Sequence, residues 1–173
     1  PGLIRKVLDA GMRNVVIPRV ETAAEVERAV EAGRFRYDGG AGERGFAAGK
    51  PAKWGMDTDG YASREDESVS VGVVVENATA LDNLEAILSV PELGFAFVGH
   101  QDLSVSLGHP QQPDHPDVQS AIEDIRDACL ERGVPLGGSV SDVDAANERL
   151  SEGYGFVRIG DELEATRKTL SQR

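Results

Sequence analysis

The chain has 173 residues, which is long enough to bury the core of one domain. Its 30 acidic and 18 basic residues give a net charge of −12, which argues against nucleic-acid and anionic-membrane partners because both bind through clusters of lysine and arginine. No apolar run approaches the roughly 18 residues that a membrane-spanning helix needs, so we expect no such helix.

The single cysteine and the acidic composition both favour a cytoplasmic location. Cys129 excludes an internal disulfide, is expected in the core, and suits the reducing cytoplasm. Many acidic residues with few lysines are also typical of proteins from a salt-rich cytoplasm, where salt screens self-repulsion. An ordinary acidic cytoplasmic protein would carry the same charge, so both interpretations stay open.

The first part of the chain predicts helix, strand and helix. Apolar spacing predicts a helix over residues 2–10 and a buried strand over residues 14–20. A second helix is expected to begin at Thr22, with Glu25 as its capping-box partner, and to end at Gly33.

Residues 34–70 form a glycine-rich, charged stretch without apolar periodicity. We expect one long loop here, within a single domain that spans residues 1–173. A connection of this length is unusual in a compact domain and is usually functional or contacts a partner.

Two acidic residues stand out in the middle of the chain because each follows an apolar, strand-like run. Glu76 closes the run 71–75, and Asp102 lies three residues beyond the run 95–99. Between them one helix is expected, begun by Asn77 and Thr79 with Asp82 as a capping-box partner and stopped at Pro91. Strand, helix and strand predict a βαβ unit with two parallel strands.

Neighbouring parallel strands lie about 4.8 Å apart, so acidic groups at their carboxyl ends face one small volume and could share a divalent cation. The alternative is that Glu76 and Asp102 only cap helices and turns. We favour the cation because no turn signal precedes Glu76 and because the residues after Asp102 predict a loop rather than an immediate helix.

The last part of the chain continues the alternation. A proline-punctuated loop, residues 109–116, precedes a helix from Pro116 to Gly133. Strands are then expected over residues 134–140 and 155–160, each followed by a helix. Five β/α repeats predict a parallel sheet, and periodicity alone would also allow a doubly wound sheet.

The three histidines have modest expected roles. His109 and His115 lie in the proline loop and are interpreted as turn or cap residues. His100 stands two residues before Asp102, and we favour a loop role over a third ligand because cations held by carboxylates prefer oxygen partners.

Several consecutive motifs resemble the HpcH/HpaI aldolase family, the metal-dependent 4-hydroxy-2-oxo acid aldolases of the pyruvate/phosphoenolpyruvate superfamily. These motifs are Val73-Val74-Val75-Glu76, Ala80-Leu81-Asp82-Asn83-Leu84, and Phe97 to Ser104 continuing to Ser106-Leu107-Gly108. Gly42-Glu43-Arg44-Gly45 is similar to a loop of the family. The resemblance runs from about Gly2 to about Leu163.

The resemblance implies a (β/α)8 TIM-type barrel, of which these repeats would be the carboxyl-terminal five, with the amino-terminal part of the barrel missing. It implies that Glu76 and Asp102 hold Mg²⁺, Mn²⁺ or Co²⁺, with Mg²⁺ favoured, and that Gly99, Gln101 and Ser139 contact the substrate. The implied reaction cleaves a 4-hydroxy-2-oxo acid to pyruvate and an aldehyde through a metal-stabilised enolate. The implied partners are a small 2-oxo acid and further copies of the chain.

The chain also departs from the family pattern. Val74 and His100 replace a glutamine and a proline, and the general-base histidine and the pyruvate-binding arginine of the family precede Pro1. No catalytic residue is therefore assigned within the chain, and we expect it to be weakly active or inactive alone. Two alternatives follow: a non-catalytic remnant or partner subunit that keeps the fold and an oligomer interface, and a lyase of acyl-CoA esters, which the absence of a basic patch disfavours.

Overall fold

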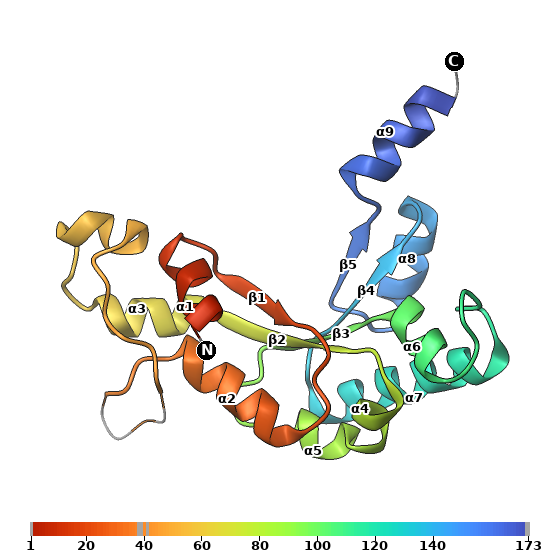
Figure 1. The fold of residues 1–173 in the computed structure, drawn as a ribbon, viewed down its shortest axis with the longest axis horizontal. Coiled ribbons are helices and arrows are strands. Elements are labelled where there is room, and N and C mark those ends of the chain that lie inside the picture. Colours follow the sequence, from red (N-terminus) through yellow and green to blue (C-terminus); the bar gives the residue numbers. More distant parts are fainter. Residues whose placement is uncertain (1, 38–39, 41, 172–173) are drawn as a thin grey trace.

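A computed structural model describes residues 2–37, 40 and 42–171 and shows one sheet of five parallel strands (Figure 1). Pro1 and residues 38–39, 41 and 172–173, including part of the predicted 34–70 loop, lie outside this description. The strands are β1 (Asn14–Ile17), β2 (Ser70–Val75), β3 (Phe95–Val98), β4 (Leu136–Val140) and β5 (Phe156–Ile159).

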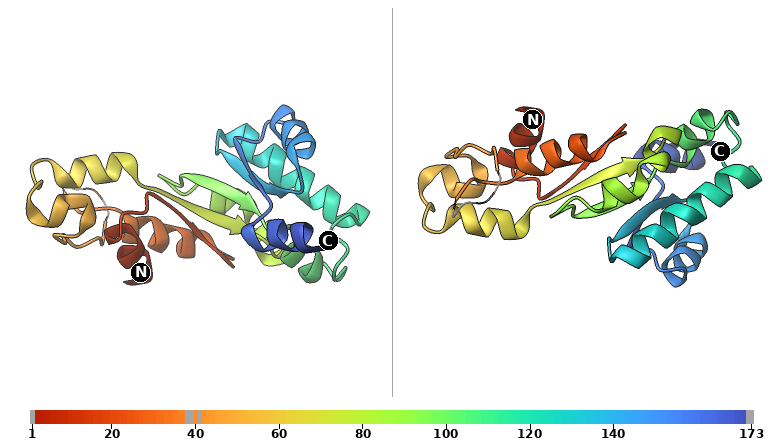
Figure 2. Two further views of the ribbon diagram at one scale, coloured as in Figure 1. Left: turned by 90° about the horizontal axis from the view of Figure 1, so that it is seen from above. Right: turned by 90° about the horizontal axis from the view of Figure 1, so that it is seen from below.

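The strands lie in the sheet in their sequence order, β1-β2-β3-β4-β5. In a doubly wound sheet the order of the strands across the sheet reverses at a switch point. The unbroken order seen here therefore excludes that architecture and favours the barrel. The strands curl as an incomplete TIM-type barrel with helices flanking them (Figures 1 and 2), which confirms the fold class predicted from the sequence.

The helices fall largely where the sequence places them. Thr22 and Glu25 form the expected capping box, and Gly133 ends its helix in the left-handed conformation at φ +68°. The α-helices are α1 (Gly2–Asp9), α2 (Ala23–Gly33), α3 (Tyr61–Ser68), α4 (Ala78–Asp82), α5 (Leu84–Leu88), α6 (His100–Ser106), α7 (Pro116–Arg132), α8 (Val143–Ser151) and α9 (Glu162–Ser171).

One face of the sheet forms the main core. Val71, Val73 and Val75 alternate along β2 and are fully buried beneath the covering helices. Cys129 lies in the same core, as predicted, and burial raises the pKa of its thiol to about 12. The thiol is therefore an inert packing group.

The other face carries aromatic rings over glycines. A Cβ at Gly72 would lie 2.3 Å from the Phe95 ring, and one at Gly137 would lie 2.3 Å from the Phe156 ring. Phe95 and Phe156 pack edge to face with their centroids 5.3 Å apart. Phe156 remains 37% exposed, so this face is only partly covered by the described residues.

The prediction of one long loop over residues 34–70 is wrong for part of the segment. The segment contains a 3₁₀ turn at Lys50–Gly55 and helix α3. Helix α3 has the sequence YASREDES and buries only Tyr61 and Glu65, so it lacks the apolar stripe that marks a helix in sequence.

Two further helix predictions are corrected. The helix expected after Asn77 is divided at Asn83 into α4 and α5, and Asn77, whose side chain accepts the Ala80 N–H at 2.8 Å, caps it without a Thr79–Asp82 box. The loop expected after Asp102 is helix α6, which follows β3 directly, so His100 is helical rather than a loop residue.

The carboxyl-terminal end of the described chain lies away from the central sheet, whereas α1 at the other end packs against the core through Leu8 (Figure 1). Helix α9 projects beyond β5 and buries none of its residues (Figure 1). None of the helices that the structure describes is long and apolar enough to span a bilayer.

Candidate functional site

Glu76 lies at the carboxyl end of β2, where its side chain is buried with 8% of its surface exposed. Its Oε1 accepts the backbone N–H of Arg19 at 2.6 Å. Arg19 takes the left-handed conformation at φ +57°, an unfavourable one for a residue with a side chain. The chain after β1 therefore turns under strain to direct an N–H at this carboxylate, and one of the two carboxylate oxygens is held in place.

The second oxygen of Glu76 faces β3. Val75 pairs with Val98 across the two strands, so Glu76 is level with Gly99. A Cβ at Gly99 would lie 2.5 Å from the Cβ of Glu76 and 2.8 Å from its Oε2. Only glycine leaves room for the carboxylate here. The N–H of Gly99 donates to Val75 O at 3.1 Å, so Gly99 contributes space rather than a free donor.

Asp102 lies in the first turn of α6, beyond the end of β3, and its side chain is exposed. This is a position where a helix favours an acid, which is the alternative interpretation of the residue. The helix nevertheless begins at Gly99 without a side-chain cap, and the side chain of Asp102 makes no hydrogen bond or ion pair within the described part of the chain. Its carboxylate is free to bind a ligand.

Hydrogen bonds join the segments of chain that surround Glu76 and Asp102. Asn77 donates to Val20 O at 3.3 Å, and Asn83 donates to Glu21 O at 2.9 Å. The hydroxyl of Ser106 accepts the Ala78 N–H at 2.9 Å. These bonds link the segments that follow β1, β2 and β3. The backbone that carries Glu76 and Asp102 is therefore held in place by hydrogen bonds between these segments.

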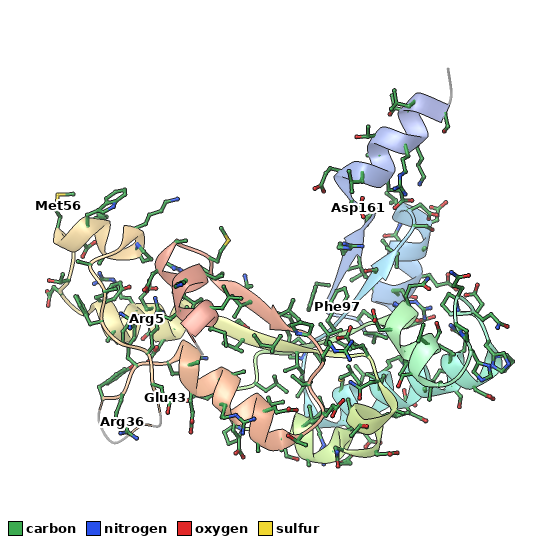
Figure 3. All side chains as sticks on the ribbon, in the orientation of Figure 1. Arg5, Arg36, Glu43, Met56, Phe97 and Asp161 are labelled. Carbon is green, nitrogen blue, oxygen red and sulfur yellow. The ribbon has the colours of Figure 1, made fainter. Side chains whose placement is uncertain are left out.

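A cleft of about 610 Å³ opens at the carboxyl ends of β3, β4 and β5. It is lined by three predicted substrate contacts, Gly99, Gln101 and Ser139, together with Asp102. Glu76 does not line it, but packs against Gly99, which does. Figure 3 labels Phe97, which lines the cleft from β3, and Asp161, which follows β5 at the start of α9. The volume suits a small organic ligand.

His100 also lines the cleft and is half-buried, with its ring 3.7 Å from where a Cβ of Gly138 would lie. Burial lowers the pKa of the ring below its ordinary value of 6.5, and the charge of Arg149 acts in the same direction. Asp114, which acts in the opposite direction, does not compensate. His100 is thus a neutral imidazole near neutral pH.

We expect His100 to make the fold less stable in mild acid. The unfolded chain takes up a proton as the pH falls through 6.5, whereas the folded chain resists protonation, so the stability present above this pH declines below it. The His100→Gln variant should lose this part of the decline. Urea unfolding about one pH unit either side of 6.5 measures it, and identical pH dependence in the two proteins would contradict the expectation.

His109, His115 and Asp117 are a second group that could hold a metal, since their ligand atoms all lie within 4.8 Å of one another. The His109 and His115 rings are stacked with centroids 3.5 Å apart, so their nitrogen lone pairs do not converge without ring rotation. His115 Nδ1 accepts the Asp117 N–H at 3.2 Å, which confirms the expected cap at the start of α7. The group fits a helix start better than a metal centre.

Sequence reasoning missed Arg149 and Arg158, the two arginines among the residues lining the cleft. Arg149 binds Glu152 at 2.8 Å and lies over the Tyr154 ring at 5.7 Å. Arg158 stands next to the end of β5. A charged residue inside a short apolar strand is a signal that could have revealed Arg158.

Comparison with known proteins extends over nearly the whole chain. Residues 1–168 match the HpcH/HpaI aldolase/citrate lyase family. A 2-dehydro-3,6-dideoxy-6-sulfogluconate aldolase of Pseudomonas putida is 36% identical over 163 residues, which are 94% of this chain and 63% of that protein. A hydroxypyruvate/pyruvate aldolase of Cupriavidus necator is 37% identical over 158 residues, 91% of this chain and 58% of that protein.

Comparison with solved structures points to the same family. An HpcH/HpaI aldolase/citrate lyase family protein from Burkholderia cenocepacia superposes with a TM-score of 0.90 at 34% identity, covering 99% of this chain and 69% of that one. The chain thus spans roughly three-fifths of the length of the curated aldolases it matches. By the match over residues 1–168, the chain belongs to the HpcH/HpaI aldolase/citrate lyase family.

Proposed function

We propose that the protein is a divalent-metal-dependent aldolase that cleaves a 4-hydroxy-2-oxo acid into pyruvate and an aldehyde. The observation that carries the proposal is the placement of Glu76, whose buried carboxylate is fixed by the Arg19 N–H and fitted against Gly99, one strand away from the free carboxylate of Asp102. The aldolases to which the chain is similar support the reaction class.

The residues at this edge fit a hard divalent cation. Glu76 and Asp102 offer carboxylate oxygens, which are the donors that Mg²⁺ and Mn²⁺ prefer, so we propose Mg²⁺, with Mn²⁺ or Co²⁺ as alternatives. Such a cation would stabilise the negative charge that develops on the 2-oxo oxygen as the C3–C4 bond breaks. Gln101 and Ser139, which line the same cleft, would contact and orient the acid.

Two measurements on the 173-residue chain test this proposal. Titration with Mn²⁺ should show one bound ion per chain, and the affinity for this ion should rise when pyruvate is present. The weak release of pyruvate from 4-hydroxy-2-oxo acids that we expect of this chain should stop when EDTA removes the ion. A chain that binds no divalent cation and releases no pyruvate would refute the proposal.

A non-catalytic partner subunit is the second candidate, favoured by the uncovered surfaces of the described residues. Val16, Ile159 and Leu163 are 45%, 49% and 65% exposed, so we propose that the protein is a homo-oligomer in either case. Tight metal binding without any pyruvate release would favour this candidate. The buried, unpaired thiol of Cys129 suits the cytoplasm that we propose as its location.

A further inference from the structure

A second, smaller cavity lies between α7 and α8, apart from the proposed metal site. Its volume is about 240 Å³, which leaves room for a ligand of only a few heavy atoms. Neither Glu76 nor Asp102 lines it. The described residues that do line it include charges of both signs: Glu123, Arg126, Glu148, Arg149 and Glu152. The cavity therefore offers charged partners to a small polar ligand.

The hydroxyl of Tyr154 marks this cavity as a binding site. Tyr154 lines the cavity and is 4% exposed, yet its hydroxyl oxygen is buried without a hydrogen-bond partner among the described residues. The ring packs closely over β4, where its Cε1 atom lies 3.0 Å from the position that a Cβ of Gly138 would take. Buried polar groups in folded proteins nearly always have a partner. A ligand in the cavity would supply the one that this hydroxyl lacks.

Tyr154 and two arginines offer donors for a carboxylate. Burial raises the pKa of Tyr154, so its hydroxyl keeps its proton near neutral pH and can donate it to a hydrogen bond. Arg149 binds Glu152 through Nη1, and Arg126 binds Asp127 through Nε and Nη2. Each guanidinium thus keeps at least one nitrogen without a partner in the described part of the chain. Such nitrogens are suited to binding a carboxylate.

Carboxylates that can accept hydrogen bonds from an ammonium group lie on the same two helices. The side chains of Glu123 and Glu148 make no hydrogen bond or ion pair with any residue that the structure describes. Glu123 lies one turn before Arg126 on α7, and Glu148 is next to Arg149 on α8. Each helix therefore brings one unpaired acid and one arginine to the cavity. A ligand with a charge of one sign only would be repelled by the residues of that sign.

We propose that this cavity binds a small zwitterion, namely a free α-amino acid. Its carboxylate binds Tyr154 and the two arginines, and its ammonium group binds Glu123 and Glu148. The inference does not rest on the function proposed above, because the proposed ligands of the cation lie outside this cavity. Gln119 and Arg149 line both this cavity and the cleft at the ends of β3, β4 and β5, so the amino acid lies beside the cleft without occupying it.

Three ligands of similar size separate the two charges. L-Alanine carries both, L-lactate has a hydroxyl in place of the ammonium group, and ethylammonium lacks the carboxylate. NMR titration of the 173-residue chain, with EDTA present to keep the cleft free of divalent ions, should show that L-alanine binds roughly 10-fold more tightly than either. No binding of L-alanine, or binding no tighter than that of L-lactate or ethylammonium, would overturn the proposal.

The Tyr154→Phe variant tests where the ligand binds. It removes only the hydroxyl and should weaken L-alanine binding roughly 3- to 10-fold. The ligand-free fold should stay at least as stable, because this hydroxyl has no partner to lose among the described residues. The matched control is Tyr61→Phe, since the Tyr61 hydroxyl accepts a hydrogen bond from Arg44 Nη2 at 3.4 Å. It should lower stability and leave L-alanine binding unchanged. Unchanged binding in Tyr154→Phe would overturn the proposed site.

Two substitutions on α7 test the charges, at residues that line the cavity but not the cleft. Arg126→Gln should reduce the preference for L-alanine over ethylammonium, because a partner of the carboxylate is lost. Glu123→Gln should reduce the preference for L-alanine over L-lactate, because a partner of the ammonium group is lost. If both preferences stayed as in the wild type, the amino-acid site would be refuted. Pyruvate release does not enter these measurements, so such a failure leaves the proposed function standing.

Discussion

Replacing Glu76 by glutamine is expected to weaken Mn²⁺ binding by about 100-fold or more, since a charged oxygen ligand becomes a neutral amide. The fold should survive, because the glutamine carbonyl can still accept the Arg19 N–H that Glu76 Oε1 accepts at 2.6 Å. Asp102→Asn should weaken binding similarly without loss of stability, because the Asp102 side chain is exposed and makes no described bond. Calorimetric or spin-resonance titration with Mn²⁺ measures both effects.

Asp114→Asn is the matched control, because Asp114 lines the same cleft without being a proposed ligand. It removes one charge and should change Mn²⁺ affinity by only a few-fold through long-range attraction. His109→Ala addresses the competing group at the start of α7. If His109→Ala abolished Mn²⁺ binding while Glu76→Gln did not, the ion would lie at that group and the proposed site would be wrong.

The Gly99→Ala variant tests whether the position of the Glu76 carboxylate matters for Mn²⁺ binding in addition to its charge. The added Cβ would lie 2.8 Å from Glu76 Oε2 and 2.5 Å from the Glu76 Cβ, both closer than a contact allows, so the Glu76 side chain must shift. This variant retains both proposed ligands. Weakened Mn²⁺ binding in Gly99→Ala would show that the position of the carboxylate, and not only its charge, determines affinity.

The parts of the fold that were predictable depend on local sequence. The alternation of strands and helices follows from apolar runs, and the Thr22–Glu25 capping box follows from four adjacent residues. The edge bearing Glu76 was predictable because an acid that ends a buried run is conspicuous. The order of the strands was not predictable from periodicity, since doubly wound sheets and barrels have the same alternation.

The parts that failed depend on contacts between distant residues. Helix α6 has few inward residues, with Leu103 and Ser104 buried, and so it resembles a loop in sequence. The break between α4 and α5 lies at Asn83, whose side chain binds Glu21 O across 62 positions of the chain. Arg158 stands out in sequence only as a charge within an apolar strand, and its place beside Ser139 follows from the register of β4 and β5.

Arg44 illustrates the same limit in the 34–70 segment, where it joins the segment to the rest of the fold. Its side chain is fully buried, and Nη2 lies 3.1 Å from Glu65 Oε2 on α3 and 3.5 Å from Asp9 Oδ1 on α1. The guanidinium also lies 4.7 Å from the centre of the Phe35 ring. Glu65 is shared with Arg13, whose Nη2 lies 2.8 Å from Oε1.

Arg44→Met is therefore expected to destabilise the fold by about 3 kcal/mol, because removing one partner leaves Glu65 buried with its charge incompletely compensated. Arg44→Met combined with Glu65→Leu should recover part of this loss, since two apolar side chains need no compensation. Lys168→Met, which breaks an exposed pair with Glu164 on α9, should cost less than about 1 kcal/mol. Urea unfolding measures all three, and equal losses in Arg44→Met and Lys168→Met would mean that burial does not strengthen the Arg44–Glu65 interaction.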